Sequence, residues 1–384
     1  MSSLSGSEPS PIHADPLATA RQFAADVIEP SAAGWEQNRE FPIEAFVSAV
    51  RQGLGGLRVP VSLGGAGLTV TETAQVLGTL AAADMGLAFG LVCHNNLAAA
   101  IANRGSPDHQ ATYLPRLLQA DQVGAFLLTE PGAGSDAAAI TTTARAVESG
   151  WTITGEKAWV TNASHAQLLN VYAQTVPGSG ARGMAAFLVD GSTPGVTVSE
   201  IYHMLGAHSS GTGSVTFADA QIPETTLFIE PGQALQAALE AIDFARTMVA
   251  AMTAAMLRNG LDIAVAYVTD REAFGEPISD KQGVRWMLAD VATNIEAADG
   301  LWRRAAAQID SGERATVAAA HAKKFATRSA FAGLSECMQL MGANGFRHDQ
   351  PLARHLAGAK MAHYLDGTTE IQNVVIARHL FSHR

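Results

Sequence analysis

The middle of the chain contains the stretch Phe126-Leu127-Leu128-Thr129-Glu130-Pro131-Gly132-Ala133-Gly134-Ser135-Asp136. A strand-like apolar run here enters a Pro/Gly loop that ends in Ser-Asp. Glycines allow backbone N–H groups to approach a phosphate closely, and the Ser135 hydroxyl can donate to the same group. Taken alone, the loop fits an ordinary strand-to-loop turn better than a ligand site, so its meaning depends on the sequence around it.

Hydrophobic periodicity divides the chain into three zones around this loop. Residues 17–122 show the helical period, with breaks at prolines and glycines. Residues 123–230 contain short β-branched runs at 151–154, 169–175, 185–189, 196–200 and 214–217, which favour a sandwich or small barrel. Residues 231–384 return to long alanine-rich helical segments at 232–269, 281–309 and 314–341, with a shorter one at 370–381. We therefore predict an α+β protein: an N-terminal α-helical domain, a central β-domain and a C-terminal four-helix bundle.

Composition narrows the class of protein. The chain has 384 residues and is 47 % hydrophobic and 16 % charged, which is typical of a globular protein with substantial cores. A net charge of −11 without a basic run argues against nucleic acid and anionic membranes as partners. We expect no membrane span, and we read residues 1–16 as a flexible lead-in rather than a signal peptide. The expected location is the cytoplasm. Cys93 and Cys337 lie far apart, and we expect both to be small buried apolar residues; no metal site is predicted.

Two further stretches suggest contacts to a flat, phosphate-bearing ligand. In Gly155-Glu156-Lys157-Ala158-Trp159-Val160-Thr161-Asn162, Trp159 and Thr161 have the spacing that places both on one face of a strand. An indole that stacks and a hydroxyl that donates suit a polar ring. In Asp270-Arg271-Glu272-Ala273-Phe274-Gly275-Glu276-Pro277, an arginine at a helix end could hold a pyrophosphate. In isolation, a core tryptophan with a sheet threonine is the better explanation of the first stretch, and a plain interhelical connection explains the second stretch equally well.

Two stretches near the C-terminus complete the set. Gln339-Leu340-Met341-Gly342-Ala343-Asn344-Gly345-Phe346 closes a long helix, for which routine C-capping is a sufficient reason. Leu365-Asp366-Gly367-Thr368-Thr369-Glu370-Ile371-Gln372 opens the final helix, where Thr368 can act as the N-cap and free N–H groups favour an anion. Asp366 is either a turn residue or a carboxylate facing a ligand.

In their order and spacing, the five motifs TEPGAGSD, GEKAWVTN, REAFGEP, QLMGANGF and DGTTEIQ resemble the acyl-CoA dehydrogenase signatures, and the resemblance runs from about residue 17 to the C-terminus. It implies a three-domain flavoprotein that binds FAD. By the same resemblance, the cofactor-binding residues are Phe126, Leu128, Thr129, Gly134, Ser135, Trp159, Thr161, Thr368 and Glu370. It also implies that a neighbouring subunit's FAD is held by Arg271, Phe274, Gln282, Gln339, Gly342, Ala343 and Asn344. A dimer or tetramer is therefore implied.

The resemblance also implies the reaction. The family removes hydrogen across the Cα–Cβ bond of an acyl thioester, carried by CoA or by an acyl-carrier protein, and passes electrons to an electron-transfer flavoprotein or a similar acceptor. A carboxylate takes the α-proton and the β-hydrogen leaves as hydride to flavin N5. The implied substrate contacts are Ser135, Asp243, Arg246 and Gly367.

The base position departs from the family's common pattern. Asp366 aligns with the usual glutamate, and Ala245 aligns with the alternative base position, so no glutamate stands at either site. Aspartate is shorter by about 1.5 Å, the length of one C–C bond. Flavin oxidases of the nitroalkane-oxidase type share this fold and use an aspartate at this position, which leaves them as an alternative. Against that alternative, Asn373 stands where those oxidases have an arginine.

Overall fold

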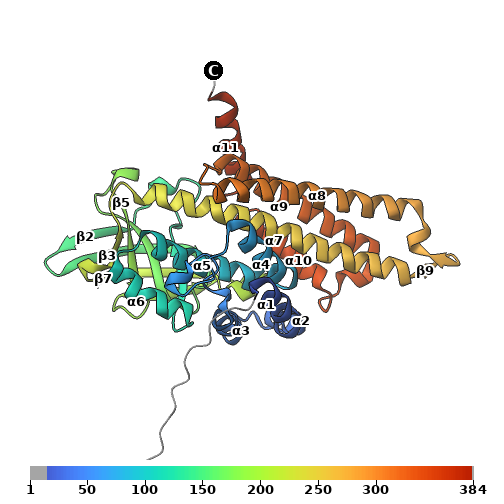
Figure 1. Ribbon diagram of the computed structural model, residues 1–384, viewed down its shortest axis with the longest axis horizontal. Coiled ribbons are helices and arrows are strands. Elements are labelled where there is room, and N and C mark those ends of the chain that lie inside the picture. The colour runs from blue at the N-terminus through green and yellow to red at the C-terminus, as the bar shows by residue number, and fades with distance from the viewer. Residues whose placement is uncertain (1–14, 383–384) are drawn as a thin grey trace, which may run out of the picture.

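The computed structural model describes residues 15–382 and confirms the predicted order of a helical zone, a β-zone and a second helical zone (Figure 1). The expectation for residues 1–16 lies almost entirely outside the described residues. Within them, the Asp15 carboxylate caps the first helix by accepting from the Leu17 N–H at 3.0 Å, and that helix begins at Pro16.

The N-terminal zone is a cluster of helices joined by short turns. Two capping arrangements fix its longest members. Thr69 and Glu72 form a reciprocal capping box at the start of α4, and Asp84 ends α4 and caps α5 through the Leu87 N–H. The helices are α1 (Pro16–Phe23), α2 (Glu29–Asn38), α3 (Ile43–Ala49), α4 (Val70–Ala83), α5 (Met85–Arg104) and α6 (Pro107–Leu118).

The central zone is one eight-stranded sheet, which confirms the predicted β-domain and its five predicted strands. Seven strands follow the order β6-β7-β3-β2-β4-β5-β8, and β1 pairs with β4 in parallel, with Phe126 opposite Asn170. The strands are β1 (Val123–Leu127), β2 (Thr143–Val147), β3 (Gly150–Val160), β4 (Ala166–Gln174), β5 (Met184–Asp190), β6 (Val196–Ile201), β7 (Gly213–Ile222) and β8 (Leu227–Ile229).

Strand β4 is buried on both faces of this sheet. Its side chains alternate between two clusters: Leu168 and Tyr172 pack with residues of α5, α6 and the first turn of α7, whereas Leu169 and Val171 pack with the inner faces of β3, β5 and β7. The first cluster fastens the sheet to the helices. Strand β1 leads into the loop of residues 128–136, called the motif loop below, and is therefore held between β4 and α5.

The C-terminal zone is a bundle of antiparallel helices. Its elements are α7 (Ala234–Asp270), the hairpin β9 (Glu272–Ala273) and β10 (Glu276–Pro277), α8 (Gln282–Asp310), α9 (Thr316–Met341), α10 (Pro351–Ala362) and α11 (Thr369–Phe381). The four-helix layout is confirmed, but its fourth helix is α10, which the sequence pattern did not predict. Helix α10 packs against α7 and α9, with Leu352, Ala359 and Ala362 buried. Helix α11, which we had assigned as the fourth helix, projects away from the bundle (Figure 1), and Gln372 is its one buried residue.

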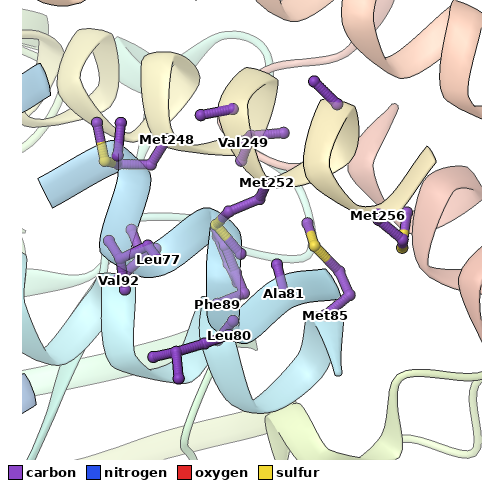
Figure 2. Close-up of a cluster of buried hydrophobic side chains, with 14 of the residues drawn as sticks. Leu77, Leu80, Ala81, Met85, Phe89, Val92, Met248, Val249, Met252 and Met256 are labelled. Carbon is purple, nitrogen blue, oxygen red and sulfur yellow. The ribbon is translucent and has the colours of Figure 1, made fainter. Parts of the chain in front are cut away.

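The N-terminal helices and the bundle share one continuous core. Figure 2 shows Met248, Met252 and Met256 of α7 facing the side chains of α4 and α5, among them Leu77 and Phe89. All five are 5 % exposed or less. Methionine side chains are flexible and fill irregular gaps well, which suits the packing of α7 against α4 and α5. The joint between the two zones is therefore packed like a domain interior.

Helices α5 and α7 are long and apolar enough to pass a length-and-composition test for a membrane span. In the most apolar window of each, 83 % of α5 and 61 % of α7 is buried inside the protein. Core helices pass the same test, and the burial of both follows from the shared core.

Candidate functional site

The Asp366 loop joins α10 to α11 and holds two consecutive residues in the left-handed region. Asp366 has φ 50° and Gly367 has φ 92°. A non-glycine residue is uncommon there and keeps that conformation only where its surroundings require it. The Arg246 Nε of α7 donates to the Asp366 carbonyl at 2.9 Å, and the Gln372 side chain donates to the Gly367 carbonyl at 2.8 Å. The loop conformation is therefore fixed by side chains from two different helices.

The Asp366 carboxyl group is the most unusual titratable group of this loop. Its Oδ2 atom is inaccessible to solvent and has no hydrogen-bond partner among the described residues. Burial raises the pKa of Asp366 to about 6, although the nearby Arg246 and Lys323 cations oppose that rise. A carboxylate with a raised pKa and a free oxygen is what proton abstraction near neutral pH requires.

Thr161 and Cys93 belong to the same site. Burial raises the pKa of the Cys93 thiol, the negative charge of Asp366 adds to that rise, and the neighbouring Thr161 hydroxyl opposes it. Thr161 follows strand β3, Cys93 belongs to α5, and Asp366 precedes α11. One residue from each of the three domains therefore meets at one place. Cys337 is fully buried in the core, as predicted, and Cys93 is partly buried and packs against the same core beside this site.

A buried ion pair ties two of the motifs together. The Lys157 Nζ lies 2.8 Å from Glu130 Oε1 and also donates to the Leu128 carbonyl at 3.1 Å. The other Glu130 oxygen accepts from the N–H and the hydroxyl of Thr141. Burial alone would raise the pKa of Glu130, but the Lys157 charge and the hydrogen bonds outweigh it and bring the pKa to about 2. The pair fixes the motif loop to strand β3.

Trp159 lies two residues after Lys157 on strand β3, and its side chain is exposed to solvent. It has φ 57°, at an irregularity in the pairing of β3 with β7, and it is 63 % exposed. Its ring contacts Tyr202, with 4.6 Å between the centroids. Left-handed backbone and an exposed indole are both unfavourable for an isolated chain, and both are explained if a flat ligand covers the ring.

The remaining residues predicted around the motif loop divide by exposure. Gly134 and Ser135 are exposed, Thr129 is partly buried, and the Thr129 carbonyl accepts from the Ala158 N–H at 2.9 Å. The Leu128 side chain is buried in the core. The Phe126 ring packs against the Tyr172 ring, with 5.1 Å between the two ring centroids. The Leu128 and Phe126 side chains therefore pack beneath the loop and are not fully exposed to solvent.

A cavity of about 410 Å³ opens beside the end of the motif loop. Its lining comes from Asp136, the 138–141 segment, Gln174 and the 177–180 turn. Gln174 holds the wall together by donating to the carbonyls of Ala138 and Gly180. The cavity adjoins Ser135 and has room for part of an extended ligand.

Arg246 and Asp243, predicted as substrate contacts, are mainly bonded to each other and to the loop. Arg246 Nη1 donates to Asp243 Oδ1 at 2.9 Å, and Thr316 donates to the second Asp243 oxygen. Because Arg246 also bonds to the Asp366 carbonyl, these contacts connect the start of α9 to the Asp366 loop. Thr368 acts as the N-cap of α11 as predicted, and Glu370 lies exposed in its first turn.

A second group of predicted cofactor residues lies at the other end of the bundle. The Asn344 side chain donates to the Tyr267 hydroxyl at 2.9 Å, which brings the 339–344 segment to the end of α7 and to the hairpin that follows it (Figure 1). All its predicted members are exposed, and Phe274, at the hairpin tip, is 96 % exposed. Arg246 and Tyr267 are 21 residues apart on α7, which is about 32 Å at 1.5 Å per residue. Within one chain, the two groups of predicted cofactor-binding residues therefore lie far apart. The members of the second group are Arg271, Phe274, Gln282, Gln339, Gly342, Ala343 and Asn344.

Lys323 is a site residue that sequence reasoning missed. It is 0 % exposed and donates to the His363 and Gly367 carbonyls, each at 2.8 Å. The signal in the sequence is its position on the apolar stripe of α9, with Ala319 and Ala326 one turn away on either side, where a lysine is unexpected. Among residues 15–382, no group of three or more His, Cys, Asp or Glu side chains could hold a metal ion.

Comparison with known proteins assigns all three zones. Family models described as the N-terminal, middle and C-terminal domains of acyl-CoA dehydrogenase match residues 11–121, 125–220 and 232–381. The chain is 35 % identical to an acryloyl-CoA reductase (NADH) of Anaerotignum propionicum over 94 % of its length and 92 % of the relative's. It is 34 % identical to the mitochondrial short-chain specific acyl-CoA dehydrogenase of Bos taurus, over 94 % and 88 % of the two chains. The solved butyryl-CoA dehydrogenase of Megasphaera elsdenii superposes with a TM-score of 0.92 at 30 % identity, covering 98 % of this chain and all of that one.

The fold and the site define a flavin-dependent oxidoreductase. The chain belongs to the acyl-CoA dehydrogenase family, whose members are FAD enzymes. The residues present fit FAD: the exposed indole of Trp159 offers a stacking surface, and the first turn of α11 offers free N–H groups to a phosphate.

Proposed function

We propose that this enzyme dehydrogenates an acyl thioester and that Asp366 removes the α-proton. The observation that carries the proposal is the Asp366 carboxyl group, with one buried oxygen free of partners and a pKa raised by burial to about 6. The unpartnered oxygen has no hydrogen bond to give up before it accepts a proton, and the pKa places the ionised form in excess at neutral pH. When bound, FAD supplies the acceptor for the two electrons of the reaction.

The chain's own residues orient and shield this reaction. Arg246 and Lys323 hold the Asp366 loop, and Thr161, directly after strand β3, lies beside Cys93. An aspartate reaches less far than a glutamate, so the substrate's α-carbon must approach the loop closely, and a displacement of about 1 Å can change the rate on the order of a hundredfold.

We further propose that the second cofactor group acts on the FAD of another copy of the chain. The separation of about 32 Å along α7 supports this, because both groups would contribute to each flavin only in an oligomer. The exposure of Phe274 and Trp286, at 96 % and 61 %, agrees with a surface that a second copy covers. An electron-transferring flavoprotein or a similar acceptor would reoxidise the enzyme.

The thioester carrier is either CoA or an acyl-carrier protein, since both present the same pantetheine arm. The exposed Ser135 and the cavity of about 410 Å³ beside it offer a path for that arm. The names of the relatives favour CoA. An aspartate base is also compatible with a nitroalkane-type oxidase, but those relatives act on thioesters, which supports the thioester reaction.

One experiment separates these functions. The purified flavoprotein is mixed without oxygen with a series of acyl-CoA thioesters and, separately, with nitroalkanes, and the flavin absorbance is followed. The proposal predicts bleaching by at least one acyl-CoA, with slow reoxidation in air and fast reoxidation by an electron-transferring flavoprotein or an artificial dye acceptor. Bleaching only by nitroalkanes, with stoichiometric peroxide on reoxidation, would support the oxidase and overturn the proposal.

A further inference from the structure

The most costly side chain near the site is Lys323. It is fully buried in the middle of α9, a helix whose other inward-facing residues are small, such as Ala319, Ala326 and Ala330. Burying an ammonium group is unfavourable unless its environment compensates for the lost water. A methionine would fill the same volume without that cost, so packing does not explain a lysine here.

The hydrogen bonds of Lys323 are directed at one structural element. Its Nζ donates to the carbonyl of His363 and to the carbonyl of Gly367, each at 2.8 Å. These carbonyls stand on either side of Asp366 in the chain. A single charged group therefore spans the loop that contains the proposed base.

The same loop is held from the opposite direction by α7. Arg246 Nε donates to the carbonyl of Asp366 itself. Asp366 has positive φ, which is unfavourable for a residue with a Cβ and persists because the surroundings hold it, whereas Gly367 adopts positive φ without strain. Three carbonyls in a run of five residues, 363, 366 and 367, thus accept from two buried cations. The carboxylate oxygen Oδ2 remains without a partner, so the cations fix the main chain and leave the reactive atom free.

We propose that Lys323 is a positioning residue for the reaction: its ammonium group fixes the Asp366 loop through main-chain hydrogen bonds, and its charge favours the ionised carboxylate. The inference rests on the proposed function of Asp366 as the base. Lys323 itself does not touch the substrate.

The charges around Lys323 determine how this arrangement responds to pH. Burial lowers the pKa of Lys323 to about 8, whereas Asp366 raises it, Arg246 of α7 lowers it, and Glu370 of α11 raises it. His363, at the other end of the loop, has a pKa lowered mainly by burial, and the cations that face it are Lys360, Lys323 and Arg328. Cys93 of α5 also faces Asp366, and burial keeps its thiol un-ionised. Asp243 is engaged by Arg246 and Thr316. Loss of the Lys323 charge therefore leaves Arg246 as the remaining cation that lowers the pKa of Asp366.

The decisive measurement is the titration of the Asp366 carboxyl group by infrared difference spectroscopy of the holoenzyme. The Asp366→Asn variant identifies the band. Wild type should show a midpoint near pH 6, and Lys323→Met should move it upward by about one pH unit, the lower end of the effect of an opposite charge a few ångströms away. Lys324→Met is the matched control: Lys324 is the next residue on α9 and is only partly buried, so the midpoint should not move.

A second variant separates charge from hydrogen bonding and covers the case in which Lys323→Met does not fold. Lys323→Gln keeps donors for the loop carbonyls but removes the charge, so the midpoint should still rise. With an acyl-CoA that reduces the wild-type flavin, both variants should lose at least about fivefold more rate at pH 6 than at pH 8.5, because a smaller share of Asp366 is ionised at the lower pH. An unchanged midpoint in either folded variant would overturn the role of Lys323. If instead Asp366→Asn retained full flavin reduction, the base assignment would fail, whatever the titration showed.

Discussion

The Glu130 carboxylate and the Lys157 ammonium lie 2.8 Å apart, and their side chains are 4 % and 0 % exposed. The pair joins two segments that are distant in sequence: the loop that contains Ser135 and the strand that contains Trp159. Because both segments are proposed to contact the cofactor, the pair connects stability to FAD binding. Its carboxylate contributes stability above the unfolded pKa of 4.5, and that contribution is lost as the pH falls toward about 2.

Lys157→Met should destabilise the protein by about 3–5 kcal/mol, because it leaves the Glu130 charge buried without its partner. FAD should also dissociate more readily, since the loop is no longer fastened to strand β3. Chemical denaturation and flavin release on dilution measure the two effects. Glu156→Gln, at the exposed neighbouring position, is the control. An unchanged denaturation midpoint in Lys157→Met would show that the pair does not hold the two motifs together.

Cys93 should resist alkylation in the folded enzyme. Burial and the nearby Asp366 charge raise the pKa of its thiol, and only the ionised form reacts readily. In a Cys337→Ala background, iodoacetamide at pH 8 should label the native protein slowly and the unfolded protein at once, as read by mass spectrometry. Rapid stoichiometric labelling of the native protein would mean that the Cys93 thiol is exposed and ionised, and would remove it from the site described above.

Asp366→Glu tests whether the pocket is shaped around the shorter side chain. The Asp366 loop is held through three main-chain carbonyls, so it has little freedom to withdraw by the length of one methylene. We expect flavin reduction by acyl-CoA to fall on the order of tenfold or more, because the carboxylate is displaced by about 1.5 Å. Stopped-flow reduction with the best acyl-CoA measures the change. Equal or higher activity would indicate that the site is an ordinary glutamate site with a shortened base.

Arg271→Ala should weaken FAD retention and leave the site around Asp366 intact. The arginine is exposed at the end of α7, far from Asp366, and in the two-chain flavin site proposed above its loss removes a charge-assisted contact to a phosphate. The ratio of flavin to protein after gel filtration measures the effect, and sedimentation gives the oligomeric state. A monomer that keeps stoichiometric FAD would contradict the proposal that the flavin site needs two chains.

The sequence predicted the architecture well because periodicity changes twice along the chain, and the elements of the structure change in the same order, from helices to strands and back to helices. It did not predict helix α10. That helix is only 12 residues long, and Arg354 and His355 interrupt its apolar stripe: His355 is buried and Arg354 is partly buried, and both face residues of the N-terminal helices. The pattern therefore resembled a loop between two helices.

Whether a site residue could be predicted depended on how far away in the sequence its partners lie. Asp366, Thr161 and Trp159 were found because each belongs to a contiguous motif. Lys323 was missed because its partners are main-chain carbonyls 40 and 44 residues away, which leave no trace in the side-chain pattern. The proximity of Cys93 to Thr161 was missed for a similar reason: the two residues are 68 positions apart in the sequence, and only the folded chain brings them together.

The central claim is that Asp366 is the base, and single-turnover flavin reduction by a saturating acyl-CoA tests it most directly. For the wild type, the rate constant should rise with pH and level off above about 6, since the carboxyl group must lose its proton before it can accept one from the substrate. Asp366→Asn keeps the shape of the side chain but cannot accept the proton. It should retain FAD while the rate falls by about three orders of magnitude or more. Full flavin reduction in Asp366→Asn, with the same dependence on pH, would contradict the account and would direct attention to another group at the loop, such as His363 or Glu370.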